Sequence, residues 1–334
     1  MNDPILNDNG MKVNSSKSKV GFAKSECISI VIPTKNRLSD LKRCLNALMG
    51  QLKMDDELII IDNGSTDGTN EYISGLVSTC RNIRIIHNDT SNLPHLFNLG
   101  WRSASCQLIG FLNDDTEPFP SWVSDIKYWF SRLPSAAVLG GPTYDQNNRI
   151  TSNLYRTNHI LLRLYDKIVA GGKLNQVGVL TDYGVYSLGV IRPKDPLRVS
   201  GLTITNMAVR RGALQEVDGF NEVFSFSNYD GFFFLEIEKR GAEMFLIPGA
   251  EVKHFPNPNG LTRSAYHLSI DYAIFYSLLK PKNLKNKIRL KLNIISYFLL
   301  WVYLSLKGKA VFREVLSGYL LGMRKAKRYK RRSR

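Results

Sequence analysis

The sequence predicts a doubly wound α/β fold, a mostly parallel β-sheet with helices on both faces, followed by a basic helical extension at the C-terminus. Strand-like and helix-like segments alternate four times over about ninety residues, and this order is typical of parallel sheets. The strand-like runs are continuously apolar and rich in β-branched residues, which indicates strands that are buried on both faces.

The first strand is expected at residues 27–32, CISIVI, and Pro33 ends it. A helix should follow, because leucines recur at helical spacing at Leu38, Leu41, Leu45 and Leu48. Ser39 and Thr34 are the candidates for its N-cap, since a hydroxyl oxygen can accept a hydrogen bond from a free N–H group of the first turn.

The next units repeat this order. They are a strand at 57–61 that ends at Asp62, a turn at 63–69, a helix at 71–77, a strand at 84–87, a helix at 93–103, and a strand at 108–112 that ends in Asn113, Asp114 and Asp115. In parallel sheets ligands bind beyond the carboxyl ends of the strands. Asp62 and the 113–115 triplet are therefore predicted to lie along one edge of one sheet.

The second half of the chain is less regular. Residues 134–200 are rich in Gly, Pro and Asn, and no element is assigned there. An amphipathic helix closed by Gly241 is expected at 232–240, and a strand is expected at 243–247.

The net charge is concentrated at the C-terminus. The chain has 45 Lys and Arg against 29 Asp and Glu, a formal net charge of +16, and residues 280–334 hold 17 of the basic residues and one acid, Glu314. Residues 292–306 form an uncharged run of fifteen, shorter than the roughly 20 residues that span hydrocarbon. The run therefore predicts an interfacial or a buried helix, and a second helix is expected at 310–322 before the polybasic end.

Composition excludes several classes of protein. Hydrophobic residues make up 43% and charged residues 22%, which excludes a disordered chain, a collagen-like fibre and a disulfide miniprotein. The four cysteines show no CxxC spacing, so reduced thiols in a cytosolic compartment are expected. Residues 1–25 are polar and lack the apolar segment of a signal peptide, which predicts a loose leader.

Six landmarks occur in order along the chain: SIVIPTKNR at 29–37, DNGSTDGT at 62–69, NDD at 113–115, DGFNE at 218–222, YD at 229–230, and His254. Together they resemble the landmarks of the family 2 glycosyltransferases with the GT-A fold, which move a sugar from a nucleotide diphosphate to an acceptor hydroxyl. The resemblance extends over about two thirds of the chain.

The resemblance implies a nucleotide site at the first three landmarks. The residues that it implies are Pro33, Thr34, Asn36 and Arg37 in the nucleotide loop, Asp62 at the imide N–H of a uracil or thymine base, and Asn113 and Asp114 beside the ribose or a metal-bound water. For Asp62 the alternative is a plain Asx-turn with Gly64. Arg210 and Arg211 are expected to face the diphosphate or to form a solvated pair.

The resemblance also implies a divalent metal, Mn²⁺ or Mg²⁺. Asp115 stands at the metal-binding position of the family's DxD motif, and His254 stands where a late histidine often joins the metal. Such a cation neutralises the leaving diphosphate, and a nitrogen ligand suits Mn²⁺ better than Mg²⁺. The alternatives are that Asp115 caps a turn and that His254 is simply packed or exposed.

Asp230 is the expected catalytic base. It falls where the family has an acidic pair, although here the first member is Tyr229. A positioned carboxylate can take the proton from the attacking hydroxyl, and one base without a second nucleophile predicts inversion. Asp230 would also suit the N-cap position of the following helix.

The domain prediction has three parts: the leader at 1–25, a GT-A domain at 26–265, and a helical, basic, membrane-associating region at 266–334. Within the GT-A domain, 26–118 is the expected nucleotide-binding half and 119–265 the acceptor-binding half, with 142–200 shaping the acceptor side. The donor is expected to be a UDP- or dTDP-sugar and the acceptor a glycan or a lipid-linked molecule.

The basic segment at 280–334 is expected to bind an anionic membrane surface, because an apolar helix and a polybasic end give two anchoring signals. This predicts a cytoplasmic protein, peripheral at the inner face of the cell membrane. Nucleic acid is not expected as a partner, because the aromatic residues lie mainly in the uncharged run rather than among the basic residues.

Two other functions fit parts of the pattern. A sugar nucleotidyltransferase has a similar sheet, but it would need a glycine-rich loop after the first strand, and residues 33–37 contain no glycine. A non-catalytic membrane adaptor with a decayed site is favoured by Asn113 and Tyr229, which replace acids of the family pattern.

Overall fold

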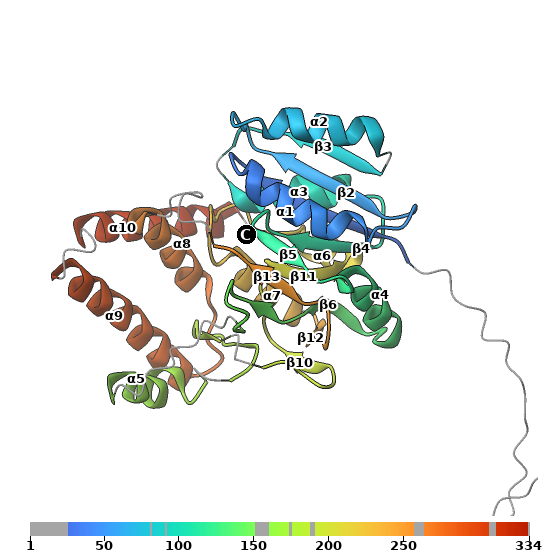
Figure 1. The fold of residues 1–334 in the computed structure, drawn as a ribbon. Helices are drawn as coiled ribbons and strands as arrows, with labels where there is room; N and C mark the ends of the chain where they lie inside the picture. The colour runs from blue at the N-terminus through green and yellow to red at the C-terminus, as the bar shows by residue number, and fades with distance from the viewer. Residues whose placement is uncertain are drawn as a thin grey trace, which may run out of the picture.

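The computed structural model describes residues 26–80, 82–90, 92–150, 160–173, 176–187, 191–256, 264–306 and 312–332. The expected leader at 1–25 lies outside these residues. An eight-stranded sheet of order β10-β12-β6-β11-β4-β1-β2-β3 runs through the body of the protein (Figure 1). Its strands are β1 Ile28–Thr34, β2 Glu57–Asp62, β3 Ile83–His87, β4 Leu108–Leu112, β6 Ala136–Gly140, β10 Leu197–Val199, β11 Asn206–Arg210 and β12 Glu243–Leu246.

The sheet is mostly parallel, as predicted. β3, β2, β1 and β4 are parallel neighbours, and β6 and β12 form a second parallel pair. β11 joins the two groups by pairing antiparallel with both β4 and β6, and β10 is an antiparallel edge strand. This inserted strand is the main departure from a simple doubly wound sheet.

Helices cover both faces of the sheet. One face packs against α1 Leu38–Met49, α2 Thr69–Thr79 and α4 Trp122–Arg132, and the other against α3 Leu93–Ser103, α6 Arg211–Val217 and α7 Tyr229–Glu238. β1 illustrates the division, because Ile28, Ile30 and Ile32 belong to the first core and Val31 to the second. Successive side chains of a strand point to opposite faces.

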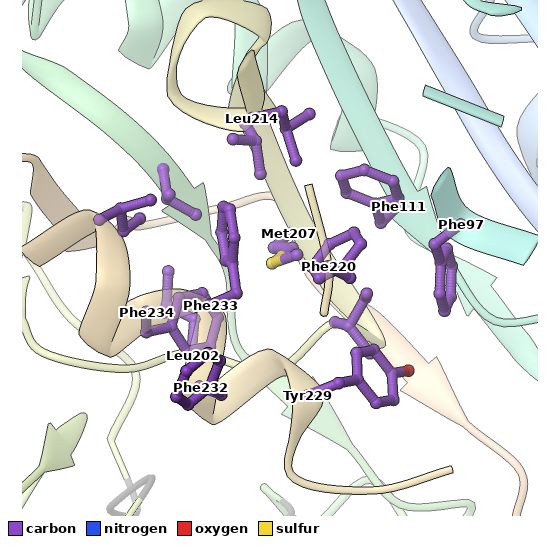
Figure 2. Close-up of a cluster of buried hydrophobic side chains, with 14 of the residues drawn as sticks. Phe97, Phe111, Leu202, Met207, Leu214, Phe220, Tyr229, Phe232, Phe233 and Phe234 are labelled. Atoms are coloured by element: carbon purple, nitrogen blue, oxygen red, sulfur yellow. The ribbon is translucent and has the colours of Figure 1, made fainter. Parts of the chain in front are cut away.

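The second core is rich in aromatic rings. Figure 2 shows Phe97 of α3, Phe111 of β4, Phe220, and Tyr229 and Phe233 of α7 gathered around Met207 of β11. The centroids of Phe111 and Phe220 lie 5.3 Å apart with their rings nearly perpendicular, an arrangement that aromatic pairs favour. The start of α7 is therefore anchored in the sheet core.

The predicted amphipathic helix at 232–240 has other bounds in the structure, and it is mostly buried rather than amphipathic. α7 starts three residues earlier, and seven of its ten residues are buried. The helix lies between the sheet and the C-terminal helices, so it has little solvent-facing surface for a polar stripe.

Two smaller sheets lie beside the main one. β5 Thr116–Pro118, β13 Val252–His254 and β7 Thr143–Tyr144 form one, with β13 in the centre. β8 Val179–Leu180 and β9 Tyr186–Ser187 form a short hairpin in the segment that the sequence left unassigned. The same segment contains α5 Ile160–Tyr165, which continues into the π-helical turn η1 Asp166–Ala170.

Three helices make up the C-terminal region: α8 Ala265–Leu278, α9 Leu284–Leu306 and α10 Phe312–Arg332. α10 lies along α8, while α9 diverges from them (Figure 1). Gly318 and Gly322 of α10 face the carbonyls of Tyr266 and Ile270, where an added Cβ would overlap the backbone of α8. The two helices therefore touch through their backbones.

α9 is longer than the uncharged run suggested and is not a buried helix. Of its residues, all of which the structure describes, Asn293 alone is buried. By length and composition α9 is also able to cross a membrane. Many of the large apolar side chains of α9, α10 and η1 are exposed: Ile168, Leu284, Ile288, Ile295, Leu299, Leu300, Val302, Tyr303, Leu306, Leu316, Leu320 and Met323.

The expectation of four reduced thiols is wrong for one pair. Cys27 and Cys106 form a disulfide bond, with their Cα atoms 5.4 Å apart. Cys27 directly precedes β1 and Cys106 lies two residues before the start of β4, and these two strands lie side by side. Sequence spacing gave no signal of this pair because the two cysteines are 79 residues apart.

A buried carboxylate, that of Asp56, stabilises the edge of the sheet at which β1 and β2 begin. Asp56 accepts hydrogen bonds from the N–H groups of Ile28 and Lys53 and contacts the Lys127 ammonium at 2.5 Å. The Asp56 side chain is fully buried and that of Lys127 is 10% exposed. A charge removed from such a pair leaves its partner uncompensated.

We expect Asp56→Asn to lower the free energy of unfolding by about 3 kcal/mol. The substitution leaves the Lys127 charge without a counter-ion and weakens the hydrogen bonds from the N–H groups of Ile28 and Lys53. Guanidinium denaturation measures the change. Asp55→Asn is the matched control, since the Asp55 residue is exposed, and it should change stability little. Equal effects of the two variants would contradict this account of Asp56.

Candidate functional site

Five of the predicted site residues contact one another at the carboxyl edge of the sheet. Thr34 ends β1, Arg37 directly precedes α1, and Asp114 and Asp115 follow β4. His254 ends β13, which pairs with β5 immediately after the two aspartates. The small sheet thus brings a residue from late in the sequence to the strand-end acids.

The two aspartates share one cation. Arg37 Nη1 lies 3.0 Å from Asp114 Oδ1 and 2.9 Å from Asp115 Oδ2. Thr34 Oγ1 donates to Asp114 Oδ2 at 2.8 Å, and His254 Nε2 lies 3.2 Å from Asp115 Oδ1. The side chains of both acids are 7% exposed, so these contacts take the place of water.

The two carboxyl groups differ in acidity. Burial, together with the charge of Asp115, raises the pKa of Asp114 to about 7, although Arg37 and Thr34 oppose the shift. Burial also acts to raise the pKa of Asp115, but contacts with His254 and Arg37 outweigh it and hold that pKa below its usual value. Asp115 is therefore the more firmly ionised of the two.

Asp115 and His254 fit two ligand positions of one metal ion. Asp115 Oδ1 is buried and makes no hydrogen bond of ordinary geometry, although the His254 nitrogen is 3.2 Å away. Neighbouring ligands of an octahedral ion with bonds of about 2.1 Å lie about 3 Å apart. The Asp115 side chain makes these contacts instead of capping a turn, and His254 is not merely packed.

This pair is not a complete metal cage. Among the described residues, no three His, Cys, Asp or Glu side chains gather as a metal site. Asp114 is directed to Thr34 and Arg37. Mg²⁺ in particular is often held by one or two carboxylates plus substrate phosphates and water, so two protein ligands are compatible with a metal that arrives with a phosphate.

The loop after β1 is tied to the turn after β2. Asn36 adopts a left-handed backbone conformation, φ +52°, which asparagine tolerates better than most residues. Its Oδ1 accepts from the Thr66 N–H at 2.7 Å, and its own N–H donates to Ser65 Oγ at 3.0 Å. These bonds fix the segment that carries Arg37.

The expected N-caps of α1 are wrong. Thr34 lies within β1 and binds Asp114, and Ser39 is inside the helix. The Leu38 N–H donates instead to Asp67 Oδ2 at 2.9 Å. The cap is thus supplied from a distant turn, and a local sequence pattern has no means of indicating it.

Asp62 makes the Asx-type contact that was the alternative to a role in base binding. Its Oδ1 accepts from the Ser65 N–H at 3.2 Å, and its Oδ2 lies 3.7 Å from His87 Nδ1. Asp62 is paired with Thr34 across β1 and β2. It therefore lies on the predicted edge at the end of β2, and β1 separates β2 from β4, which precedes the aspartate pair Asp114–Asp115.

Pro33 and Asn113 also lie at this edge. Pro33 is buried within β1 opposite Ile61 of β2. Asn113 follows β4, and its Nδ2 donates to Thr205 Oγ1 at 3.4 Å. The side chain of Asn113 is thus directed to the segment that leads into β11.

Asp230 lies in the first turn of α7, and the loop before this helix is bound to α3. The loop before α7 bonds to the start of α3, where the Leu93 N–H donates to the Ser225 carbonyl at 2.9 Å. α3 begins beyond the carboxyl end of β3. Asp230 is the second residue of α7, and Asn228 rather than Asp230 is its N-cap residue.

Tyr186 is a neighbour of Asp230 that sequence reasoning missed. Its hydroxyl is buried and makes no hydrogen bond. Burial raises the pKa of Tyr186, and the charge of Asp230 raises it further. Tyr186 lies on β9 in the irregular segment at 134–200, where no pattern singled it out.

The expectation that Arg210 and Arg211 face a diphosphate is wrong. Arg210 ends β11 opposite Leu108, the first residue of β4, so both arginines lie at the edge away from the aspartate pair. They are not a solvated pair either. Arg210 donates to the carbonyls of Phe130 and Ala136, and Arg211 donates to carbonyls between α3 and β4.

Solved structures share this fold. A mannosyltransferase from Pyrobaculum calidifontis, solved in complex with GDP-Man and Mn²⁺, superposes with a TM-score of 0.54 at 12% identity. The match covers 89% of this chain and 86% of that one. The predicted GT-A architecture is thereby confirmed.

The sequence relatives of this chain include a glycosyltransferase. Glycosyltransferase AglE of Haloferax volcanii is 30% identical over 99 residues, 29% of this chain and 33% of the relative. Uncharacterized protein y4gI of Sinorhizobium fredii is 25% identical over 235 residues, 68% of this chain and 24% of the relative. The chain thus spans a third or less of the length of these relatives.

The sequence model of glycosyl transferase family 2 matches residues 29–216, which is more than half of the chain. The matched region contains all of β1 except Ile28, the aspartate pair and β11. On this match, and in agreement with the landmarks of the sequence, the chain belongs to glycosyl transferase family 2.

Proposed function

We propose that this protein transfers a sugar from a UDP- or dTDP-sugar to a hydroxyl of a glycan or lipid-linked acceptor, with inversion and with Mn²⁺ or Mg²⁺ as cofactor. The observation that carries the proposal is the buried Asp115 oxygen without a hydrogen bond, 3.2 Å from His254 Nε2. The mannosyltransferase with the same fold was solved with Mn²⁺, which supports a divalent cation here.

On the donor side, the chain binds and orients the nucleotide diphosphate. Asp115 and His254 would hold the metal, and the metal would offset the charge that grows on the leaving diphosphate. Arg37 supplies a guanidinium beside Asp115. Thr34 holds Asp114 by a hydrogen bond, and Asp114 would contact the ribose or a water on the metal. Asp62 accepts a hydrogen bond from the imide N–H of the base.

On the acceptor side, Asp230 accepts the proton of the attacking hydroxyl. A single carboxylate that acts as general base, without a second nucleophile, leads to direct displacement at the anomeric carbon and hence to inversion. The first turn of α7 suits the ionised form of Asp230, because the partial positive charge of a helix N-terminus favours an anion. The proposed domain for this chemistry is residues 26–265.

We also propose that residues 280–334 dock on an anionic membrane surface at the cytoplasmic face. The exposed apolar side chains of α9 and α10 supply apolar contact area. The end of α10 carries exposed basic residues at Arg324, Lys327, Arg328, Lys330, Arg331 and Arg332. Apolar and basic features together give stable binding, whereas one alone is marginal.

Asp115→Ala and Asp230→Asn should each lower the release of nucleoside diphosphate by about 10²- to 10⁴-fold, because each removes a group that acts on charge or proton in the transition state. The assay is a panel of UDP- and dTDP-sugars with acceptor glycans, with and without Mn²⁺.

Glu117→Gln and Glu238→Gln are the matched controls, since Glu117 lies on β5 close to Asp115 and Glu238 ends the helix of Asp230. Both should retain activity. Full activity in both aspartate variants would contradict the proposed site, and a wild-type protein inactive on every donor would favour the adaptor function.

Asp115→Asn and His254→Ala should weaken Mn²⁺ binding in the presence of UDP by about tenfold or more, since even residues that only orient a metal ligand have effects of this size. Loss of the imidazole should weaken Mn²⁺ more than Mg²⁺, because Mg²⁺ prefers oxygen ligands. Titration calorimetry measures both affinities. His95→Ala, on α3, is the control, and unchanged affinity in both test variants would rule out this metal site.

The triple variant Arg324→Gln, Lys327→Gln, Arg328→Gln should bind anionic vesicles about 100-fold more weakly, because each basic residue contributes about 1 kcal/mol near such a surface. Co-sedimentation with phosphatidylserine vesicles measures the change. The control replaces the exposed Arg132, Lys239 and Arg240 of the body by Gln. Binding as tight as that of the wild type would contradict docking through α10.

A further inference from the structure

Asp271 of α8 is a buried carboxylate that no step of the proposed reaction uses. It is fully buried. Its Oδ1 accepts from the Ser225 N–H at 3.0 Å, and its Oδ2 accepts from the N–H groups of Phe226 at 2.7 Å and Ser227 at 2.9 Å. A buried charge is costly unless its oxygens are satisfied, so one carboxylate and three consecutive amides hold one another in place.

These three residues lead directly into α7. Ser227 is followed by Asn228, the N-cap residue, whose left-handed backbone, φ +60°, turns the chain into the helix. Asp230 is the second helical residue. The position of residues 225–227 therefore determines where α7 begins and where the Asp230 carboxylate lies.

The same loop is held from its other side by the start of α3. The Leu93 N–H donates to the Ser225 carbonyl at 2.9 Å, and Asn92 Nδ2 donates to the Phe224 carbonyl at 2.9 Å. The loop is thus held between α3, which follows a strand of the nucleotide-binding half, and α8 of the C-terminal region. Rigid support from both sides is what a residue of a reaction site requires.

α8 is itself braced by α10. Ile270, the neighbour of Asp271, has its carbonyl directly against Gly322, where a Cβ would overlap it. Burial raises the pKa of Asp271, while the three amides and the Lys325 charge on α10 oppose the shift. Both the backbone contact and the charge connect Asp271 to α10.

We propose that Asp271 is a positioning residue for sugar transfer: its carboxylate, held on α8, fixes the start of α7 and so aims Asp230 at the acceptor hydroxyl. The inference rests on the proposed function, in which Asp230 takes the proton. Its physical basis is that a misplacement of about 1 Å at a reacting group can lower the rate by about 100-fold.

The test variant is Asp271→Asn in the full chain. The amide has one acceptor oxygen, and its NH₂ group would face an N–H, so at least one of the three bonds is lost. We expect kcat to fall by about 10- to 100-fold, with the KM for the sugar nucleotide unchanged, because the donor side is built on other residues. Asp271→Glu, which keeps the charge but moves it by one methylene, should also lower kcat alone.

Asp56→Asn is the matched control. Asp56 is also a buried carboxylate that accepts two backbone N–H groups, but it lies at the opposite edge of the sheet. It should lower stability and leave the kcat of the folded enzyme unchanged. The comparison separates an effect on stability from an effect on the placement of Asp230.

A wild-type kcat in Asp271→Asn, with Asp230→Asn inactive, would overturn this inference alone. An equal fall of kcat in the Asp56 and Asp271 variants would also overturn it, as would failure of both Asp271 variants to fold, because each result would make Asp271 a residue of stability only. Activity that survives in Asp230→Asn would contradict the proposed function and the inference with it.

Discussion

The site depends on one ion contact, the Arg37 guanidinium between Asp114 and Asp115. Two carboxylates on consecutive residues at a buried strand end repel each other and lose their hydration, so one cation must lie between them. Arg37 comes from the loop after β1 and the aspartates from the end of β4, so the same contact joins two neighbouring strands. A diphosphate would add negative charge here, which explains why the proposed reaction needs a metal beside the arginine.

Much of the sheet could be predicted because its parallel strands are short, continuously apolar runs that are rich in β-branched residues. β2 and β4 were predicted to within one residue, and α3 coincides with the predicted 93–103. The strand-end positions of Asp62, Asp114 and Asp115 followed from the parallel order alone. The roles of Asp62 and Asp230 stay predictions, since the place of a side chain in the fold does not determine its chemistry.

What the sequence did not predict depends on contacts between distant segments. Three contacts each join residues that are 29 or more positions apart: the Cys27–Cys106 bond, the Asp67 cap of α1, and the bonds of Asp271 to residues 225–227. A local periodicity in the sequence does not indicate such contacts. α7 was misjudged because its burial comes from the C-terminal helices on one side and the sheet on the other. α9 extends beyond its uncharged run because the basic first turns are helical as well.

The antiparallel strand β11 has a consequence for synthesis of the chain. β3, β2, β1 and β4 come from the first third of the sequence, yet β4 gains its second neighbour only when residues 206–210 have been made. Chains are synthesised at about 5–20 residues per second. The N–H and C=O groups at the outer edge of β4 therefore stay unpaired for several seconds or longer during synthesis. An apolar strand with an unpaired edge can pair with another chain and aggregate. Nascent chains of this protein should therefore need a bound chaperone during that interval.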